Sequence, residues 1–191
     1  MKRKIYNKLV DWKNKSQGKT ALLIEGARRV GKSYIVEEFA KQEYDSYLLI
    51  NFRKTPQEVK HWFDIYLEDI DKLLQNLQLH YNKRLTPRHS LIIFDEVQAC
   101  PRAREAVKFL VEDGRFDYIE TGSLISIKKN VKGIVIPSEE DKLEMHPMDF
   151  EEFLWAVGNM TLMPFIRQCF ENKTPLGQAL HRKAMDLFRL Y

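Results

Sequence analysis

The chain has 191 residues, of which 44% are hydrophobic and 30% charged, so we expect a folded domain, with room for a small appendage, and not a disordered chain. The formal net charge of +4 is mild, and it neither requires nor excludes contact with nucleic acid. The two cysteines, Cys100 and Cys169, and the scattered histidines show no zinc spacing and no disulfide framework, which favours a reducing compartment.

The ends of the chain give no sign of export or of a membrane span. The start, MKRKIYNKLVDW, carries basic residues without the apolar core of a secretory signal. The longest aliphatic run, near SLIIF, is far shorter than the roughly 20 residues that cross a bilayer. We therefore expect a cytoplasmic protein with no membrane partner.

Buried strands alternate with helices along most of the chain. Residues 4–15 carry apolar side chains at helical spacing and are predicted to form an amphipathic helix. The strands expected next are ALLIEG (21–26), YLLINF (47–52), SLIIFDE (90–96) and YIETGS (118–123), and the helices expected between them cover 32–42, 57–82 and a segment from Pro101. Such alternation predicts an α/β fold whose parallel sheet is covered by helices on both faces.

The pattern weakens after the fourth strand and then becomes helical. Short strands are expected at GIVI (133–136) and LEM (143–145). Asp149, followed three positions later by Glu152, predicts a capping box that opens a helix. Two more helices are predicted over 162–172 and 175–190, the second capped by Thr174. Because no stop signal precedes Tyr191, we expect a fragment of a longer chain.

The first strand leads directly into GARRVGKS (26–33), which fits the phosphate-loop pattern G-x-x-x-x-G-K-[ST] in full. Gly26 and Gly31 allow the backbone to approach an anion, and the following helix adds its positive end. Lys32 is expected to reach the β- and γ-phosphates of ATP, and the Ser33 hydroxyl to ligate Mg²⁺. The alternative is a basic turn that fits the pattern by chance.

The expected ATP-binding residues are Gly26, Ala27, Arg28, Arg29, Val30, Gly31, Lys32, Ser33 and Tyr34. Within this set the two arginines have three possible roles. They can touch phosphate, touch a neighbouring subunit, or form outward salt bridges, and the last is favoured because loop side chains usually point outward.

Two acids emerge at the carboxyl end of the third strand, where ligands bind in open α/β sheets. Asp95 is expected to hold Mg²⁺, largely through water, and Glu96 to accept a proton from the attacking water or to orient it. Gln98 is placed to help fix Glu96. The alternative is a helix cap or a surface ion pair.

The fourth strand ends in ETGS (120–123), so polar side chains lie at its carboxyl end. Thr121 is the first candidate to contact the γ-phosphate or the water, and Ser123 the second. The alternative is a turn built on Gly122.

The ordered set GARRVGKS, DEVQACP, TGS and PMDFEEFL resembles a prokaryotic family of AAA+-type ATPases over almost the whole chain. The resemblance implies a P-loop NTPase (AAA+-like) sheet of order 5-1-4-3-2, then a helical lid, then a further nucleic-acid-binding or nuclease-like region. It divides the chain into an amino-terminal helix (1–18), an ATPase core (19–148) and the start of the lid (149–191).

The sequence departs from the family after the sensor. It has VKGIVI (131–136) where many relatives have a Gly-Arg pair, so the arginine finger is not defined by the resemblance. Arg102 and Arg104 are possible donors from a neighbouring subunit, with ordinary surface positions as the default.

The expected function is Mg²⁺-dependent ATP hydrolysis, slow in this chain alone, with Lys32, Glu96, Thr121 and Ser123 as the catalytic set. A slow ATP-dependent switch is the main alternative; a phosphotransferase is disfavoured because such enzymes have less need of Glu96. A homo-oligomer and an unidentified protein partner are possible. Nucleic acid is weakly supported by the basic amino-terminal helix and by IKKNVK (127–132).

Overall fold

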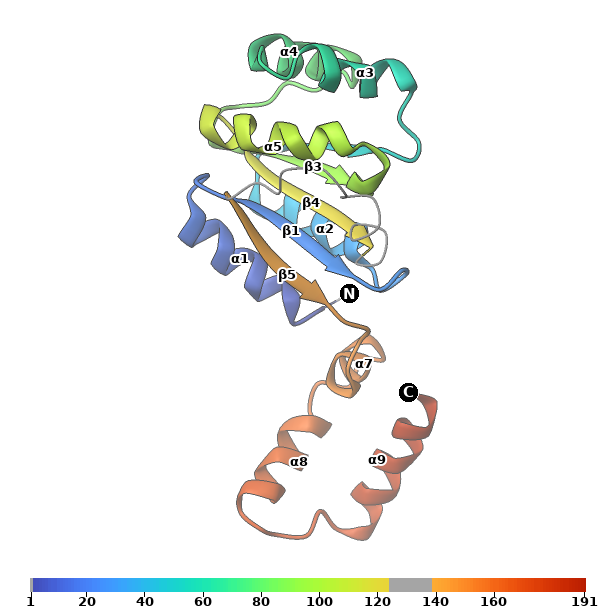
Figure 1. Cartoon of the computed structure of the whole chain (residues 1–191). Helices are drawn as coiled ribbons and strands as arrows, with labels where there is room; N and C mark the ends of the chain where they lie inside the picture. The colour runs from blue at the N-terminus through green and yellow to red at the C-terminus, as the bar shows by residue number, and fades with distance from the viewer. Residues whose placement is uncertain (1, 124–138) are drawn as a thin grey trace. The chain divides into compact units, whose positions relative to one another are not determined.

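The computed structural model describes residues 2–123 and 139–191, and it contains one five-stranded parallel sheet (Figure 1). The strands are β1 (Ala21–Gly26), β2 (Ser46–Asn51), β3 (Ser90–Asp95), β4 (Asp117–Ser123) and β5 (Glu140–Met145). Their order in the sheet is β2-β3-β4-β1-β5, and all four pairings are parallel. This is the expected order 5-1-4-3-2 read from the other edge, so the predicted fold class is confirmed.

The helices agree with the predicted elements except at two places. They are α1 (Ile5–Ser16), α2 (Lys32–Glu43), α3 (Gln57–Ile65), α4 (Ile70–His80), the 3₁₀ turn η1 (Val97–Ala99), α5 (Pro101–Asp113), α7 (Phe150–Ala156), α8 (Leu162–Glu171) and α9 (Gln178–Leu190). Strand β5 includes the predicted LEM. The segments GIVI and IKKNVK lie outside the described residues.

Two helix predictions were wrong. The single helix expected over residues 57–82 is divided into α3 and α4, because the Asp69 carboxylate accepts the amide of Lys72 at 3.1 Å and starts a new helix. The last helix begins at Gln178 after Gly177, and not at Pro175. Thr174 does not cap it, since its amide donates to the Cys169 carbonyl (2.9 Å) just beyond the end of α8.

The chain forms two compact units, and the larger one, Asn7–His146, contains the sheet. On one face, side chains from alternate strand positions join α3, α4 and α5 in the main hydrophobic core, where the rings of Phe52, Phe63 and Phe94 pack at 5.5–5.6 Å between centroids. Helices α1 and α2 lie on the other face (Figure 1). The inner strands β1, β3 and β4 are therefore buried on both faces, as the apolar runs of β1 and β3 require, whereas the edge strand β5 is largely exposed.

The smaller unit consists of Met1–Tyr6 and Pro147–Tyr191. Its helix α7 has the predicted capping box, in which the Asp149 carboxylate accepts the Glu152 amide (2.9 Å) and the Glu152 carboxylate accepts the Asp149 amide (3.2 Å). Glu152 also pairs with Arg3 at 3.2 Å, which fastens the first residues of the chain to α7. No helix among the described residues is long and apolar enough to cross a lipid bilayer.

A buried group of charged side chains lies within the larger unit, beneath α5. Arg104 donates one Nη2 to both carboxylate oxygens of Glu140, at 2.8 and 3.0 Å. Glu120, in the middle of β4, is fully buried, and neither of its oxygens has a hydrogen-bond partner among the described residues. Burial, reinforced by the charge of Glu140 and opposed by Arg104, raises the pKa of Glu120 to about 8.

We expect Glu120→Gln to make the free energy of unfolding less dependent on pH. The folded chain keeps a proton on Glu120 up to about pH 8, whereas the unfolded chain releases it near the ordinary pKa of 4.5. The folded wild type is therefore penalised progressively between these two values, by roughly 3–5 kcal/mol above pH 8. Urea unfolding should show similar stabilities at pH 5 and a more stable variant at pH 8–9.

Glu144→Gln, at a half-exposed position of β5, is the matched control and should change the stability little at any pH. A difference between Glu120→Gln and wild type that stays constant from pH 5 to 9 would contradict a buried protonated carboxyl.

Candidate nucleotide-binding site

Polar side chains gather at the carboxyl edge of the sheet. Strands β1, β2, β3 and β4 end at Gly26, Asn51, Asp95 and Ser123, and their parallel pairing brings these ends to one edge. In an open parallel sheet this edge is where ligands bind. The loop after β1 and the acids after β3 therefore meet in space, although they are more than 60 positions apart in sequence.

The loop between β1 and α2 depends on glycine at two positions. Gly26 has φ 153°, and a Cβ there would collide with the backbone carbonyl of Met145 on the neighbouring strand β5. Gly31 has φ 95° and is the residue from which α2 begins. The chain thus turns directly from a buried strand into the first turn of a helix, whose amides are the ones that bind anions.

The Lys32 side chain lies across this loop. Its Nζ donates to the carbonyls of Gly26 (3.2 Å) and Ala27 (2.7 Å), and the residue is only 7% exposed. Burial lowers the pKa of Lys32, while the nearby charges of Glu96 and Asp95 oppose that shift. The ammonium is held at the mouth of the loop, beside the two acids that follow β3.

Asp95 is the centre of a hydrogen-bonded cluster that joins four elements. Its Oδ1 accepts from the hydroxyls of Ser33 (2.6 Å) and Thr121 (2.5 Å), and its Oδ2 accepts from the amide of Asn51 (2.5 Å). The carboxylate is almost fully buried, and each bond comes from a different helix or strand. Such bonds to a charged acceptor offset the cost of burying it.

Glu96 follows Asp95 directly but has a different conformation and environment. Its backbone is left-handed (φ 56°, ψ 45°), which costs about 1 kcal/mol for a residue with a Cβ. Its carboxylate accepts from Gln98 (2.6 Å) and pairs with Arg53 (2.8 Å), and its side chain is 27% exposed. The predicted contact of Gln98 with Glu96 is therefore confirmed.

A pocket of about 600 Å³ lies beside this cluster. The residues that line it are Arg28, Arg29, Gly31, Lys32, Ser33, Tyr34, Arg53 and Glu96. Six of these eight belong to the phosphate loop and its following helix, and Arg28 and Arg29 are exposed at its rim. Neither Asp95 nor Thr121 lines the pocket: Asp95 is linked to it by the bond that it accepts from Ser33, and Thr121 by its own bond to Asp95. Ser123 lies opposite Gly26 in the β1–β4 register and does not line the pocket.

Two residues of this site were not predicted from the sequence. Asn51 and Arg53, at the end of β2, contact Asp95 and Glu96 respectively. A local sign of both is that polar Asn51 and Arg53 alternate with apolar residues in INFR (50–53), where a strand ends at the edge of the sheet that binds ligands. The prediction that Arg104 could reach a neighbouring subunit was wrong. Arg104 is 3% exposed and bound to Glu140, so its guanidinium is not available to another subunit.

The residues at the pocket fit a magnesium–phosphate group. Ser33, Asp95 and Thr121 present hydroxyl and carboxylate oxygens, which are the ligands that Mg²⁺ prefers. Within residues 2–123 and 139–191, no group of three or more His, Cys, Asp and Glu side chains could hold a metal ion alone. An ion at Ser33 and Asp95 would therefore need phosphate and water oxygens to complete its coordination.

A parallel sheet whose first strand enters a G-x-x-x-x-G-K-S loop and then a helix defines the class of P-loop nucleotide-binding proteins. The chain belongs to the AAA domain family, whose model matches residues 18–154. This membership supports a nucleotide-binding function of the ATPase type.

Other comparisons add little to this assignment. A solved structure of C. elegans PCH-2 is similar with a TM-score of 0.43 and 13% sequence identity, over 87% of this chain. The chain spans 46% of the length of that protein. A comparison with curated proteins gave no significant match.

Gly26→Ala should destabilise the chain by roughly 2–4 kcal/mol, since it adds backbone strain to a collision with the main chain of β5. Gly114→Ala is the matched control: Gly114 also has a positive φ (70°), but its Cβ would meet nothing closer than 4.0 Å, so about 1 kcal/mol is expected. Thermal unfolding of both variants measures the difference. Equal losses would show that β5 does not restrict the loop.

Proposed function

We propose that the chain binds Mg·ATP at this pocket and hydrolyses it. The observation that carries the proposal is the meeting of Lys32, Ser33 and Asp95, where a phosphate loop adjoins a buried carboxylate at the carboxyl edge of the sheet. Family membership supports nucleotide binding of the ATPase type, and the residue roles below follow from the contacts.

The loop and Lys32 bind the phosphates in this proposal. The ammonium exchanges its bonds to the loop carbonyls for the β- and γ-phosphate oxygens, and the first-turn amides of α2 add further donors. Ser33 and Asp95 would hold Mg²⁺, which would supply positive charge against the charge that develops on the phosphates. Thr121 holds the Asp95 carboxylate in place by a hydrogen bond. Ser123, the other polar candidate at the end of β4, is then the one left to contact the γ-phosphate or the water.

Glu96 orients the attacking water and accepts its proton. Its side chain lines the pocket and is partly exposed, whereas the Asp95 carboxylate is buried and already accepts three bonds. Arg53 and Gln98 restrain the Glu96 carboxylate. This restraint favours a second candidate function, a slow ATP-dependent switch, in which hydrolysis acts as a timer.

Three further assignments are part of the proposal. Residues 1–18 are assigned as the segment of the amino-terminal helix, 19–148 as the ATPase core and 149–191 as the start of a helical lid. Subunits associate so that an arginine reaches a neighbouring pocket, and Arg102 remains a candidate because it is half-exposed. The protein acts in the cytoplasm on an unidentified protein partner.

Lys32→Ala should abolish measurable ATP binding, because the loop loses its only ammonium. Glu96→Gln should retain ATP binding and reduce hydrolysis at least 100-fold, since an amide cannot accept the proton. Calorimetric titration with ATP and Mg²⁺ and a phosphate-release assay measure the two effects. Wild-type ATP affinity in Lys32→Ala would overturn the site assignment.

Arg53→Ala should raise kcat for ATP hydrolysis several-fold, because Glu96 loses the ion pair that restrains it. Lys54→Ala, the same truncation at the next exposed position, is the control and should leave kcat unchanged. A kcat for Arg53→Ala as low as that for Glu96→Gln would show instead that Arg53 is needed for the reaction.

A further inference from the structure

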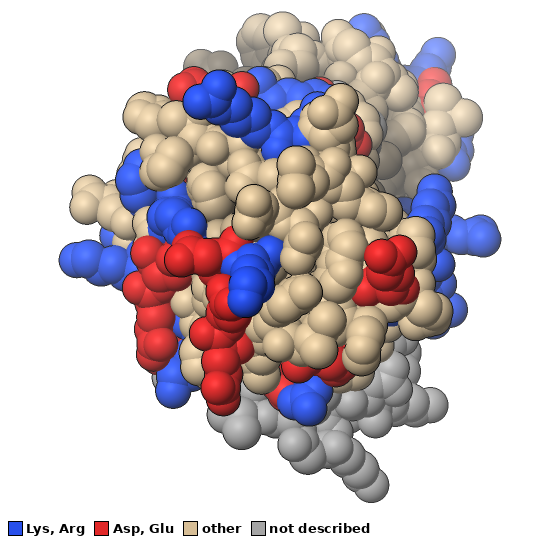
Figure 2. Space-filling view, turned by 90° about the horizontal axis from the view of Figure 1, so that it is seen from above, with Lys and Arg blue, Asp and Glu red and all other residues tan. Residues whose placement is uncertain are grey.

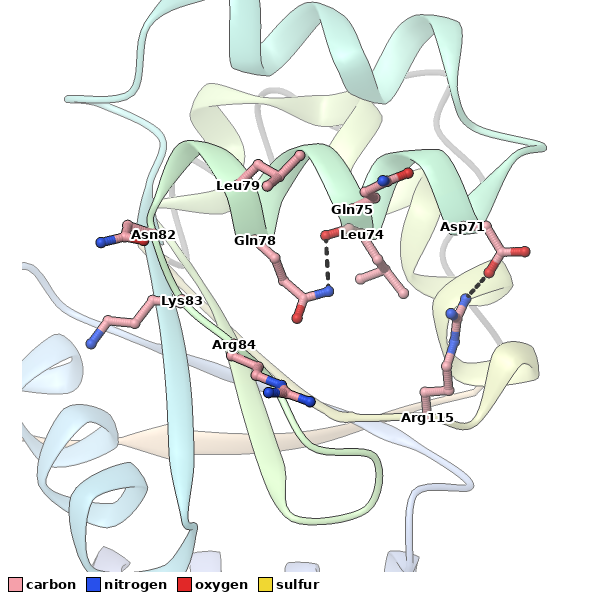
Figure 3. Close-up of a pocket in the computed structure, with 9 residues that line it drawn as sticks. All are labelled: Asp71, Leu74, Gln75, Gln78, Leu79, Asn82, Lys83, Arg84 and Arg115. Atoms are coloured by element: carbon pink, nitrogen blue, oxygen red, sulfur yellow. Dashed lines mark hydrogen bonds and ion pairs between the residues drawn. The ribbon is translucent and has the colours of Figure 1, made fainter.

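A second hollow, of about 520 Å³, lies at the amino-terminal edge of the same sheet. Its walls come from α4, from the segment that enters β3 and from the segment that enters β4 (Figure 3). No residue that lines it belongs to the nucleotide pocket, which is at the carboxyl edge. The proposed hydrolysis therefore gives this hollow no role.

The hollow carries positive charge that its own acids do not neutralise. Three cations line it, Lys83, Arg84 and Arg115, against one acid, Asp71. Arg115 is already balanced, because it pairs with Asp71 at 2.7 Å and with Asp113 at 2.8 Å. Arg84 is exposed and makes no hydrogen bond or ion pair with another residue in the described part of the chain. The excess charge is thus concentrated at Lys83 and Arg84.

The segment that presents these cations is fixed to α4. The Gln78 side chain donates to the Leu74 carbonyl (3.3 Å) and accepts the Leu85 amide (2.9 Å), and the Gln78 carbonyl accepts the Lys83 amide (2.9 Å). Figure 3 shows Leu74 and Gln78 extending from α4 toward the side where Arg84 lies. Because the backbone of this segment is already fixed, binding of an anion would have to order only the side chains that contact it.

The lining also offers apolar and amide groups. Leu79 is 71% exposed, and Gln75 and Asn82 add side-chain amides around it. An occupant that matches this set needs carboxylates for Arg84 and Lys83, an apolar side chain for Leu79, and backbone groups for the amides. Those are the features of an acidic peptide segment.

We propose that this hollow binds an acidic peptide segment of a partner protein, with at least one leucine-like side chain. Nucleic acid fits less well, because no aromatic side chain lines the hollow to stack on a base. Figure 2, which views the chain from above Figure 1, shows both basic and acidic side chains on the face that it draws.

Selection of random 12-residue peptides against the immobilised chain tests this proposal. The selected peptides should be enriched in Asp and Glu together with Leu, Ile or Met. Their affinity, measured by fluorescence anisotropy, should fall at least tenfold in Arg84→Glu. Arg182→Glu is the matched control, since it makes the same charge reversal at an exposed arginine of α9 without a pairing among the described residues, and it should leave the affinity unchanged.

Other outcomes would overturn the proposal. Selected peptides without enrichment in acids, or with affinities that Arg84→Glu leaves unchanged, would exclude this ligand class at the hollow. Arg84-dependent binding of a 20-nucleotide single strand, without Arg84-dependent binding of the selected peptides, would assign the hollow to nucleic acid. Arg84-dependent self-association without peptide binding would assign it to a second copy of the chain. ATP titration of Arg84→Glu checks that the variant is folded.

Discussion

The three hydrogen bonds to the Asp95 carboxylate are the interaction on which the site depends. Ser33 donates from α2, Thr121 from β4 and Asn51 from β2, so one buried charge ties together the elements around the phosphate loop. A carboxylate at this depth is tolerated only because its oxygens are bonded. If the Ser33 hydroxyl is lost, the carboxylate no longer has this hydrogen bond to the helix that carries Lys32.

Asp95 and Glu96 are adjacent in the chain, but their side chains have different surroundings and different proposed roles. Asp95 is the last residue of β3 and lies within the donor cluster, whereas the left-handed conformation of Glu96 turns its side chain into the pocket. Glu96 is then restrained by Gln98 and Arg53, which come from the following turn and from the end of β2. The two carboxylates are therefore held by different side chains, while the Thr121 hydroxyl contacts both residues, since it also accepts the Glu96 amide at 3.4 Å.

The two edges of the sheet carry different polar groups, and the central strand contains a buried acid. At the carboxyl edge, hydrogen-bond donors surround the Asp95 carboxylate. At the amino edge lies the cationic hollow that Arg84 lines. Between them Glu120 is buried without a hydrogen-bond partner among the described residues, beside the Arg104–Glu140 pair. A neutral, protonated Glu120 is the form compatible with that position, and it links the stability of the central strand to pH.

The sequence alone determined the features that depend on neighbours in the chain. The phosphate loop, the four core strands, the acid pair and the Asp149–Glu152 capping box follow from short-range patterns, and the strand order followed from a family resemblance. Tertiary structure alone decided which distant side chains meet. Polar residues where the second strand ends mark Asn51 and Arg53 as candidates, but their contacts with the acids have no local signature. The same holds for the burial of Arg104 and Glu120, because each arises when folding places residues tens of positions apart side by side. The break between α3 and α4 and the late start of α9 were also decided there, since competing caps at Asp69 and Gly177 prevailed over helical periodicity.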